Sequence, residues 1–146
     1  MDVIDLSKNI IAYAGAKGYR VTNLKLQKTL YYVQGYYLAR YNRPLFDDEI
    51  VNWAYGPVVP EAYFQFCSYG ASPIDAEDIK DFFAGLGFDE TALVCRVVNV
   101  CLKLTARQLV DHTHAEEPWL RTTRNQIIDM MSIKTFFSSA DPLGIK

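Results

Sequence analysis

Apolar residues recur at helical spacing from the start of the chain. The first stripe consists of Val3, Leu6, Ile10 and Tyr13. These positions share one face of a helix, and Gly18 follows where a helix commonly ends in a left-handed residue. The pattern predicts a helix from about Asp2 to Lys17.

The strongest helical pattern begins at Thr22 or Asn23, either of which can cap a helix, and ends before Pro44. Its apolar arc, which covers about half of the circumference, is formed by Leu24, Leu26, Leu30, Tyr31, Val33, Tyr37 and Leu38. Tyr32 and Tyr36 fall on the opposite, polar side. We therefore expect these two tyrosines to be exposed and to contact a partner.

Two glutamines, Gln27 and Gln34, lie within the apolar arc of this helix. Leaving a buried amide unpaired costs about 1–3 kcal/mol. The amides therefore either bond to a loop that crosses the helix or face a partner protein. Bonding within the fold is favoured because most buried polar groups are satisfied there, and partner contact stays as the alternative.

Alternation replaces the helical period after this helix. Ile50, Asn52 and Ala54 alternate with Val51, Trp53 and Tyr55, which predicts a short strand. A hairpin with Leu45 and Phe46 is expected before it, and Gly56-Pro57 is expected to end it. A second strand is expected from Ile127 to Met130, and the two strands are expected to pair.

Capping signals mark the remaining helices. Thr105 and Gln108 form a capping box, which predicts a helix of about two turns that begins at Ala106. Proline at the first helical position and acidic residues in the first turn mark other starts. These starts are expected at Pro60, at Asp75, after Asp89 and after Ser132.

These elements predict an α+β fold that is predominantly α-helical. We expect one compact domain of about six helices with a small two- or three-stranded β element. The domain is expected over residues 1–140 and a flexible tail over 141–146, because the closing "SSADPLGIK" is polar. A chain of 146 residues can bury the core of one such domain.

Composition and charge narrow the class of protein. The chain is 50% hydrophobic with a formal net charge of −2, so it should fold, and it has no general attraction to phosphate backbones or anionic lipid. No segment approaches the roughly 20 apolar residues of a membrane span, and no secretion signal opens the chain. We expect a cytoplasmic protein whose Cys67, Cys95 and Cys101 are reduced, buried thiols.

The stretch "HTHAEEPW", residues 112–119, concentrates the chemically versatile side chains. Its histidines are two apart and would point about 200° from each other on a helix, which does not suit zinc. His114 with Glu116 or Glu117 could act as acid and base, but no complete catalytic site assembles. The sequence therefore indicates no enzyme, no metal and no other cofactor.

A DNA-binding autoregulator is the alternative function. Residues 105–124 can be interpreted as a helix-turn-helix that carries Arg121 and Arg124 on its second element. Glu116 and Glu117 in the turn would face phosphates, and the overall charge gives no supporting field. Nucleic acid is therefore the less favoured partner.

Three separated stretches resemble the Panacea antitoxin domain family. They are "NLKLQKTLYYVQGYYLARYNRPLFDDEIVNWAYGPVVPEAY", "THAEEPW" and the closing "IKTFF". The family includes phage-associated proteins and SocA-like antitoxins, among them a proteolytic adaptor. The resemblance implies a non-enzymatic bacterial or prophage protein that neutralises a toxin encoded nearby, by direct binding or by delivery to an ATP-dependent protease.

The resemblance also assigns residues. Its aromatic-glutamine helix and its Thr-His-x-Glu-x-Pro-Trp pattern fall on Gln27, Tyr31, Tyr32 and Gln34, and on Thr113, His114, Glu116, Pro118 and Trp119. We take Tyr32, Tyr36, Gln27 and Gln34 as candidate partner-binding residues, and the second pattern with Trp53, Tyr55 and Pro57 as a structural motif. In that motif we expect Pro118 to start a helix, Trp119 to anchor it in the core, and His114 and Glu116 to bond to backbone or to each other.

Two stretches depart from the family pattern. Phe136-Phe137 stands where the family usually has Tyr-Phe, and the segment from Glu77 to Asp89 matches poorly. If this segment helps to choose the toxin, the toxin cannot be inferred from relatives.

Overall fold

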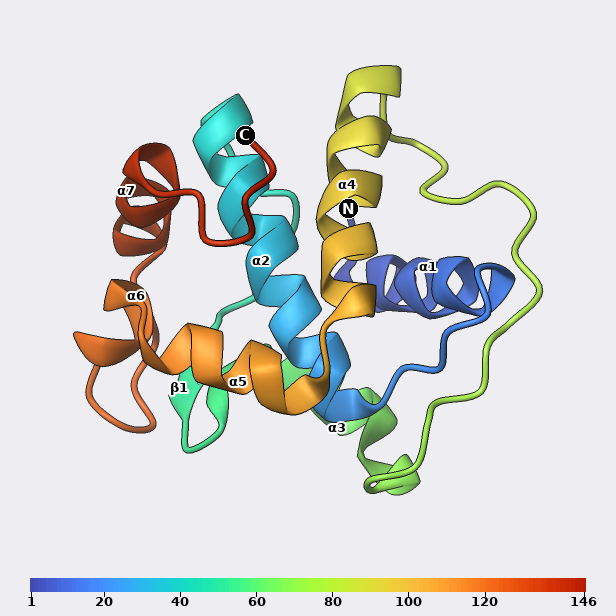
Figure 1. Cartoon of the computed structure of the whole chain (residues 1–146), viewed down its shortest axis with the longest axis horizontal. Helices are drawn as coiled ribbons and strands as arrows, with labels where there is room; N and C mark the ends of the chain where they lie inside the picture. Colours follow the sequence, from blue (N-terminus) through green and yellow to red (C-terminus); the bar gives the residue numbers. More distant parts are fainter.

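A computed structural model describes all residues from 1 to 146 as seven α-helices, one short 3-10 helix and a two-stranded antiparallel sheet (Figure 1). The predicted α-dominated α+β fold is confirmed. The helices are α1 (Val3–Ala16), α2 (Asn23–Tyr41), α3 (Pro60–Phe66), α4 (Phe88–Lys103), α5 (Ala106–His114), α6 (Glu117–Leu120) and α7 (Met130–Ser139). The strands are β1 (Val51–Trp53) and β2 (Gly56–Val58), and the 3-10 helix is Cys67–Tyr69.

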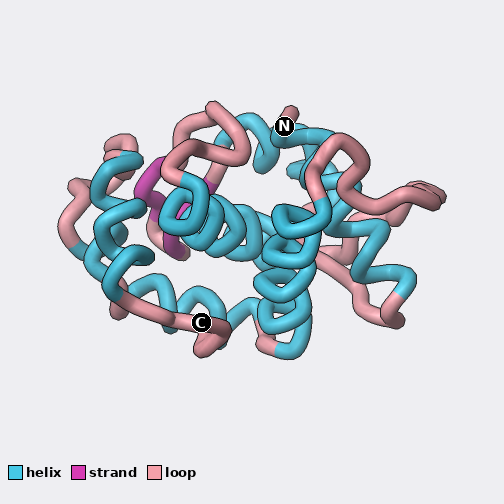
Figure 2. Tube along the Cα trace, turned by 90° about the horizontal axis from the view of Figure 1, so that it is seen from above, coloured by secondary structure: helices cyan, strands magenta, loops and turns pink.

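Helix α2 is the centre of the molecule. It contacts α1, α3, α4, α5, α7 and β2, and Figures 1 and 2 show the other helices arranged around it. Fourteen of its nineteen residues are buried, so it has almost no solvent face. The expectation that Tyr32 and Tyr36 are exposed is therefore wrong, because α5, α7 and the C-terminal tail cover the side of α2 that its sequence marks as polar.

A close approach between α2 and α7 depends on Gly35. A Cβ atom built on Gly35 would lie 2.2 Å from the ring of Phe137. The Phe137 ring also makes edge contacts with Tyr31, Tyr32 and Tyr36. Only a residue without a side chain lets α7 bring this ring onto the middle of α2.

The sheet forms differently from the sequence expectation. Gly56 and Pro57 do not end β1 but form β2, with Trp53 opposite Gly56 and Asn52 opposite Pro57. Proline fits because β2 is an edge strand. Leu45 and Phe46 form no hairpin and instead bond to α2. The expected pairing of β1 with the 127–130 segment exists as a single bridge between Val51 and Ile127, and Met130 belongs to α7.

The expected helix that starts at Asp75 does not form. Residues 71–87 contain only turns and irregular chain, drawn in yellow-green in Figure 1. Ile74 and Phe83 are the buried anchors of this segment, and most of its acidic residues are exposed. With two separated apolar anchors and repelling acidic groups between them, the segment lacks the continuous apolar face that stabilises a helix.

Helix caps agree with the sequence in part. Thr105 and Gln108 form the predicted capping box of α5, Pro118 lies in the first turn of α6, and Pro60 starts α3. Two caps differ from expectation. Gly87 caps α4 in place of Asp89, and Asp129 caps α7 in place of Ser132, because each helix begins earlier than predicted.

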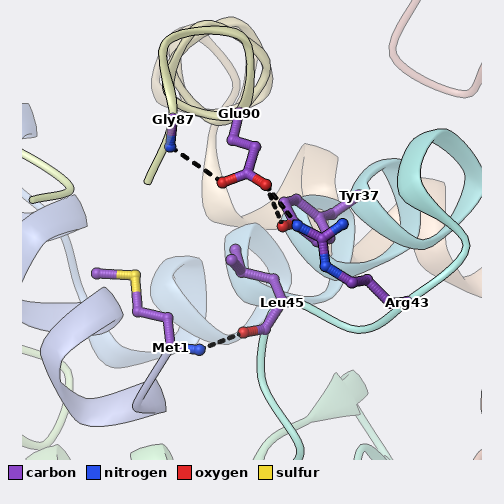
Figure 3. Close-up of polar contacts among 6 residues, drawn as sticks. All are labelled: Met1, Tyr37, Arg43, Leu45, Gly87 and Glu90. Carbon is purple, nitrogen blue, oxygen red and sulfur yellow. Dashed lines mark hydrogen bonds and ion pairs between the residues drawn. The ribbon is translucent and has the colours of Figure 1, made fainter. Parts of the chain in front are cut away.

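A group of hydrogen bonds to Glu90 joins the C-terminal end of α2 to the first turn of α4 (Figure 3). The Glu90 carboxylate accepts hydrogen bonds from the Tyr37 hydroxyl at 3.0 Å, the Arg43 guanidinium at 2.6 Å and the Gly87 N–H at 3.1 Å. These bonds hold the pKa of Glu90 below its ordinary value, with the Gly87 N–H as the largest cause. Figure 3 also shows the Met1 amino group, which donates to the Leu45 carbonyl.

The closing residues return to α2. The Tyr36 hydroxyl donates to Asp141 at 2.7 Å and accepts from the Leu143 N–H at 2.9 Å, and Figure 1 shows the red tail leading from α7 toward the upper end of α2. These contacts give residues 141–146 a place on the fold. Their flexibility stays a prediction.

The three cysteines lie in different environments. Cys101 is buried and Cys95 half-buried, whereas Cys67 is exposed, which corrects the expectation for that residue. Burial raises the pKa of the Cys101 thiol to about 12. None of the seven α-helices combines the length and apolar character that crossing a bilayer requires.

Gly35→Ala tests the close approach of α2 and α7. The added methyl group must push against the Phe137 ring, and such overpacking costs about 1–3 kcal/mol of the free energy of unfolding. Urea unfolding measures the loss. Gly15→Ala in α1 is the matched control, because its Cβ would lie 3.4 Å from the Ala76 Cβ and should leave stability unchanged or higher by up to about 1 kcal/mol. A Gly35→Ala variant as stable as the parent would contradict the close packing.

Candidate functional site

The turn between α5 and α6 points its polar side chains at α2. Glu116 is buried, and its two carboxylate oxygens accept hydrogen bonds from the Tyr31 hydroxyl at 3.0 Å and the Tyr32 hydroxyl at 2.7 Å. The rings of the two tyrosines meet edge to face with centroids 5.0 Å apart. We call Glu116, Tyr31, Tyr32 and Lys28 the buried polar hub.

Burial changes the proton affinity of the hub. It raises the pKa of Glu116 to about 7, although the two tyrosine hydroxyls act in the opposite direction. Burial, followed by the charge of Glu116, raises the pKa of both Tyr31 and Tyr32 well above the ordinary tyrosine value. Both tyrosines therefore stay protonated and act as donors to the carboxylate.

Lys28 is the cationic member of the hub. Its side chain is fully buried, and its ammonium donates to the Pro57 carbonyl of β2 at 2.9 Å. Burial lowers the pKa of Lys28 to about 7. A Cβ atom on Gly56 would lie 2.6 Å from the Thr113 hydroxyl and 2.8 Å from the Lys28 Cε, so the hairpin can reach the hub only because Gly56 has no side chain.

His114 and Trp119 form a stacked pair beside the hairpin. Their ring centroids are 4.1 Å apart, and the Trp119 indole N–H donates to the Trp53 carbonyl at 3.0 Å. The Asn52 amide donates to the carbonyls of Trp119 and Thr122. Trp119 is half-buried. It binds the hairpin near the surface instead of anchoring α6 in the core as expected.

The expected bonds of His114 and Glu116 are wrong. Glu116 bonds to two tyrosine hydroxyls of α2, and the buried His114 Nε2 has no hydrogen-bond partner in the fold. Sequence spacing could not predict these partners, since Tyr31 and Tyr32 are 85 and 84 residues away from Glu116. Thr113, in the last turn of α5, and Pro118, in α6, are buried, and their structural role stays a prediction.

The two glutamines bond within the fold, as favoured. The Gln34 amide donates to the Phe46 carbonyl at 2.6 Å and accepts from the Leu45 N–H at 2.8 Å. The Gln27 carbonyl accepts from the Val59 N–H at 2.9 Å, and its amide donates to Asn23, which in turn donates to the Tyr63 carbonyl. The glutamines thus hold two crossing loops on α2, and both are buried.

Direct partner contact is not available to the four candidate partner-binding side chains in this conformation. The exposed fractions of Tyr32, Tyr36, Gln27 and Gln34 are 0%, 2%, 1% and 0%. Tyr36 lies apart from the hub and bonds to the tail through Asp141. Of these four, Gln27 and Tyr36 each line one of the five principal surface cavities.

An aromatic surface lies over the Gln27 end of α2. Its members are Leu24, Trp53, Tyr55, Tyr63 and Phe64, from α2, the hairpin and α3. Trp53 meets Tyr63 with ring centroids 5.0 Å apart and Phe64 at 6.1 Å. Tyr55 and Phe64 are 68% and 63% exposed, so two large aromatic side chains of this surface face solvent.

A cavity of about 310 Å³ is lined by Trp53, Tyr55 and Tyr63, and no charged residue lines it. Asn23 and Gln27 supply polar groups to its lining. The sequence expectation placed Tyr55 in a structural motif and missed Phe64 altogether. The only sequence signal for Tyr55 and Phe64 is the number of aromatic residues in the hairpin and in the neighbouring α3. The fold then brings these residues together in space.

The hub contains residue types that can act as acid and base, but no principal surface cavity gives a substrate access to them. None of the five principal surface cavities is lined by Lys28, Tyr31, Tyr32 or Glu116. No group of three or more His, Cys, Asp and Glu side chains is arranged to hold a metal ion. The hub therefore acts on the fold, by joining α2 to the hairpin and to the α5–α6 turn.

The helix-turn-helix alternative lacks its second helix. Helix α6 has four residues, which is too short to lie along the major groove of DNA. Arg121 pairs with Glu117 at 3.5 Å, and the Arg124 guanidinium lies over the Trp119 ring at 5.9 Å. Neither arginine is presented by a recognition helix.

The hub makes stability depend on pH with opposite signs on the two sides of neutrality. Folded Glu116 keeps its proton up to about pH 7, whereas the unfolded carboxyl loses it near 4.5, so its contribution falls as pH rises from 4.5 to 7. Folded Lys28 loses its proton near 7, whereas the unfolded amine keeps it up to 10.5. Its contribution therefore rises from pH 7 to 10.5, and the two groups together stabilise the fold least near pH 7.

Glu116→Gln tests this pH dependence. Between pH 4.5 and pH 7 the parent should lose on the order of 3 kcal/mol of unfolding free energy relative to the variant. Urea unfolding at several pH values measures the difference. Glu117→Gln, at the exposed neighbouring position, should run parallel to the parent, and Lys28→Met should diverge only above pH 7. Parallel curves for the parent and Glu116→Gln would refute the raised pKa.

Comparison with known proteins identifies the family. Residues 26–120, from α2 to the end of α6, match the family model "Antitoxin SocA-like, Panacea domain". The chain is 31% identical over 129 residues to Antitoxin SocA of Caulobacter vibrioides (strain NA1000 / CB15N), which covers 82% of this chain and 69% of that protein. No solved structure matches the chain. The chain belongs to the SocA-like antitoxin, Panacea domain family.

Proposed function

We propose that this protein is an antitoxin that neutralises a toxin encoded beside it, and that the toxin docks on the aromatic surface. The observation that carries the docking site is the aromatic cluster of Trp53, Tyr55, Tyr63 and Phe64, in which Tyr55 and Phe64 are exposed. Tyrosine and tryptophan anchor many protein interfaces because they bury a large area at a small entropic cost. An uncharged cavity among them suits an apolar side chain of the partner.

The four aromatic members of this surface, Trp53, Tyr55, Tyr63 and Phe64, lie within residues 26–120, which match the family model. A protein that neutralises a toxin by contact needs an accessible surface, and none of the five principal surface cavities reaches the titratable groups of the hub. Both points favour a binding module over an enzyme.

The buried residues support this surface from below. Gln27 holds the Val59 end of the hairpin and, through Asn23, the α3 backbone. Lys28 holds the Pro57 carbonyl. We assign Gln27 an indirect role in toxin binding, through the spacing between the hairpin and α3. The other three residues lie farther from the aromatic surface and act on the fold. Tyr32 holds Glu116, Tyr36 holds the tail, and Gln34 holds the loop of residues 45–46 on α2.

The double variant Tyr55→Ser/Phe64→Ser tests the docking surface. Both side chains are exposed, so the fold should keep its melting temperature while affinity for the toxin falls by about 100-fold or more, the effect of losing two interface anchors. The toxin is found by inducing each neighbouring open reading frame alone and together with this gene, and the affinity is measured by titration calorimetry. Growth rescue should weaken in parallel.

Phe88→Ser provides the matched control. Phe88 is 89% exposed and stands at the start of α4, outside the aromatic surface, so its loss should leave affinity and rescue unchanged. Parent-like affinity in the double variant would exclude the aromatic surface. Absence of any toxic neighbour would remove the antitoxin proposal itself.

Neutralisation by delivery to an ATP-dependent protease makes a separate prediction about toxin lifetime. If the protein is a proteolytic adaptor, co-expression should shorten the half-life of the toxin in cells where protein synthesis has been stopped, and removal of the protease gene should restore it. The Tyr55→Ser/Phe64→Ser variant should also restore the half-life. A toxin that is silenced but persists at its normal half-life would point to neutralisation by binding alone.

A further inference from the structure

A second cavity, of about 350 Å³, lies on another part of the molecule, between the C-terminal half of α2, α4, α7 and the tail. Three cationic side chains line it, namely Arg40 from α2, Arg96 from α4 and Lys146 from the tail. No acidic residue lines it. Three elements distant in sequence thus bring positive charges around one opening.

The two arginine charges have no ion-pair partner within the fold, whereas the Lys146 ammonium lies close enough to Asp141 to help lower the pKa of that carboxyl. The ion pairs of the structure are Lys8–Glu77, Arg43–Glu90, Arg107–Asp111 and Arg121–Glu117. Neither Arg40 nor Arg96 has a carboxylate within ion-pair distance. Asp141 is the acid on the adjoining tail, and its carboxylate is occupied by the Tyr36 hydroxyl and the N–H groups of Ile145 and Lys146.

The hydrogen bonds of the three cations leave donors free. Arg96 donates through one terminal nitrogen to the Ile145 carbonyl, and the Lys146 ammonium donates to the Phe137 carbonyl. Arg40 makes no hydrogen bond within the fold and lies 5.9 Å from the Tyr41 ring centre. A guanidinium carries five donors in a rigid fork that matches the oxygens of a phosphate, so both arginines keep donors for a ligand.

The rest of the lining is apolar. Ala39, Leu93 and Ile145 face the same cavity. A cavity of this volume is at the lower end of the range of roughly 300–1,000 Å³ that small-molecule sites occupy. The lining therefore suits a small molecule with an anionic group at one end and an uncharged organic group at the other.

We propose that the cavity between Arg40, Arg96 and Lys146 binds a small organic phosphate, with the phosphate between the two guanidinium groups and the organic part against Leu93 and Ile145. A phosphate monoester carries close to two negative charges at neutral pH, which matches two unpaired guanidinium groups and the nearby Lys146 ammonium better than a single carboxylate does. The site is independent of the aromatic surface and of the toxin.

Titration calorimetry of the full chain tests the proposal with three probes. Adenosine monophosphate is expected to bind with a stoichiometry of one, adenosine is expected not to bind, and inorganic phosphate is expected to bind more weakly than adenosine monophosphate. Binding should weaken as salt is added, because exposed charges carry it. Absence of binding by both phosphate compounds at millimolar concentration would overturn the proposal, and equal affinity for the two would overturn the role of the apolar side.

Substitutions locate the site. Arg40→Gln and Arg96→Gln should each weaken binding of adenosine monophosphate by about tenfold or more, the effect of losing a charge-assisted hydrogen bond. Arg20→Gln is the matched control. Arg20 is exposed and unpaired in the loop between α1 and α2, and its replacement changes the net charge by the same amount. Equal weakening in Arg20→Gln and Arg40→Gln would show a general charge effect and overturn the site.

Arg96 also holds the tail, so its variant needs a second measurement. Arg96→Lys keeps the positive charge and a donor for Ile145 but loses the fork, and its affinity should lie between the parent and Arg96→Gln. If the arginine variants weaken the toxin complex while the parent binds no phosphate compound, the cavity is a protein contact and the proposal is wrong. Growth rescue plays no part in these outcomes, so failure here leaves the antitoxin proposal untouched.

Discussion

The burial of α2 on nearly all sides is the constraint from which the rest of the structure follows. A central helix in so small a protein must be apolar all round or must find an internal partner for each polar side chain. This helix contains Gln27, Lys28, Tyr31, Tyr32 and Gln34, and each of them bonds to a segment that crosses the helix. The polar side chains thereby determine where the crossing segments lie.

Burying the ionisable side chains of the hub costs stability. Glu116 and Lys28 both have a pKa near 7 in the fold, so at neutral pH neither gains the full stability that its favoured state would give. Buried charges of this kind are weak evidence for stability but can specify one arrangement among several of similar packing. Here they specify how the hairpin and the α5–α6 turn sit on α2.

Family signature and binding surface lie at different depths of the molecule. Most residues of the Thr-His-x-Glu-x-Pro-Trp stretch and of the aromatic-glutamine helix are buried and bond to one another or to crossing loops. The exposed side chains that can bind a partner or a ligand lie elsewhere, on the aromatic surface and around Arg40 and Arg96. Membership of the family therefore explains the scaffold, while recognition of a particular partner depends on residues that the signature supports from within. The segment from Glu77 to Asp89, expected from the sequence to depart from the family pattern, lies within the residues that match the family model and is mostly exposed, irregular chain.

The sequence by itself determined the helices with strong local signals. Helix α2, the capping box of α5 and the proline starts of α3 and α6 are set by side chains within one or two turns of each other, so their period and caps could be recognised. Local signals also showed that Gln27 and Gln34 need partners. They could not show which faces are covered, and Tyr32 and Tyr36 were placed on a polar side that does not exist once α5, α7 and the tail pack against it. Only the tertiary structure brought Glu116 to two tyrosines more than eighty residues away, paired Gly56 and Pro57 with β1 and assembled the aromatic surface, because contacts between distant segments depend on packing that no local pattern contains.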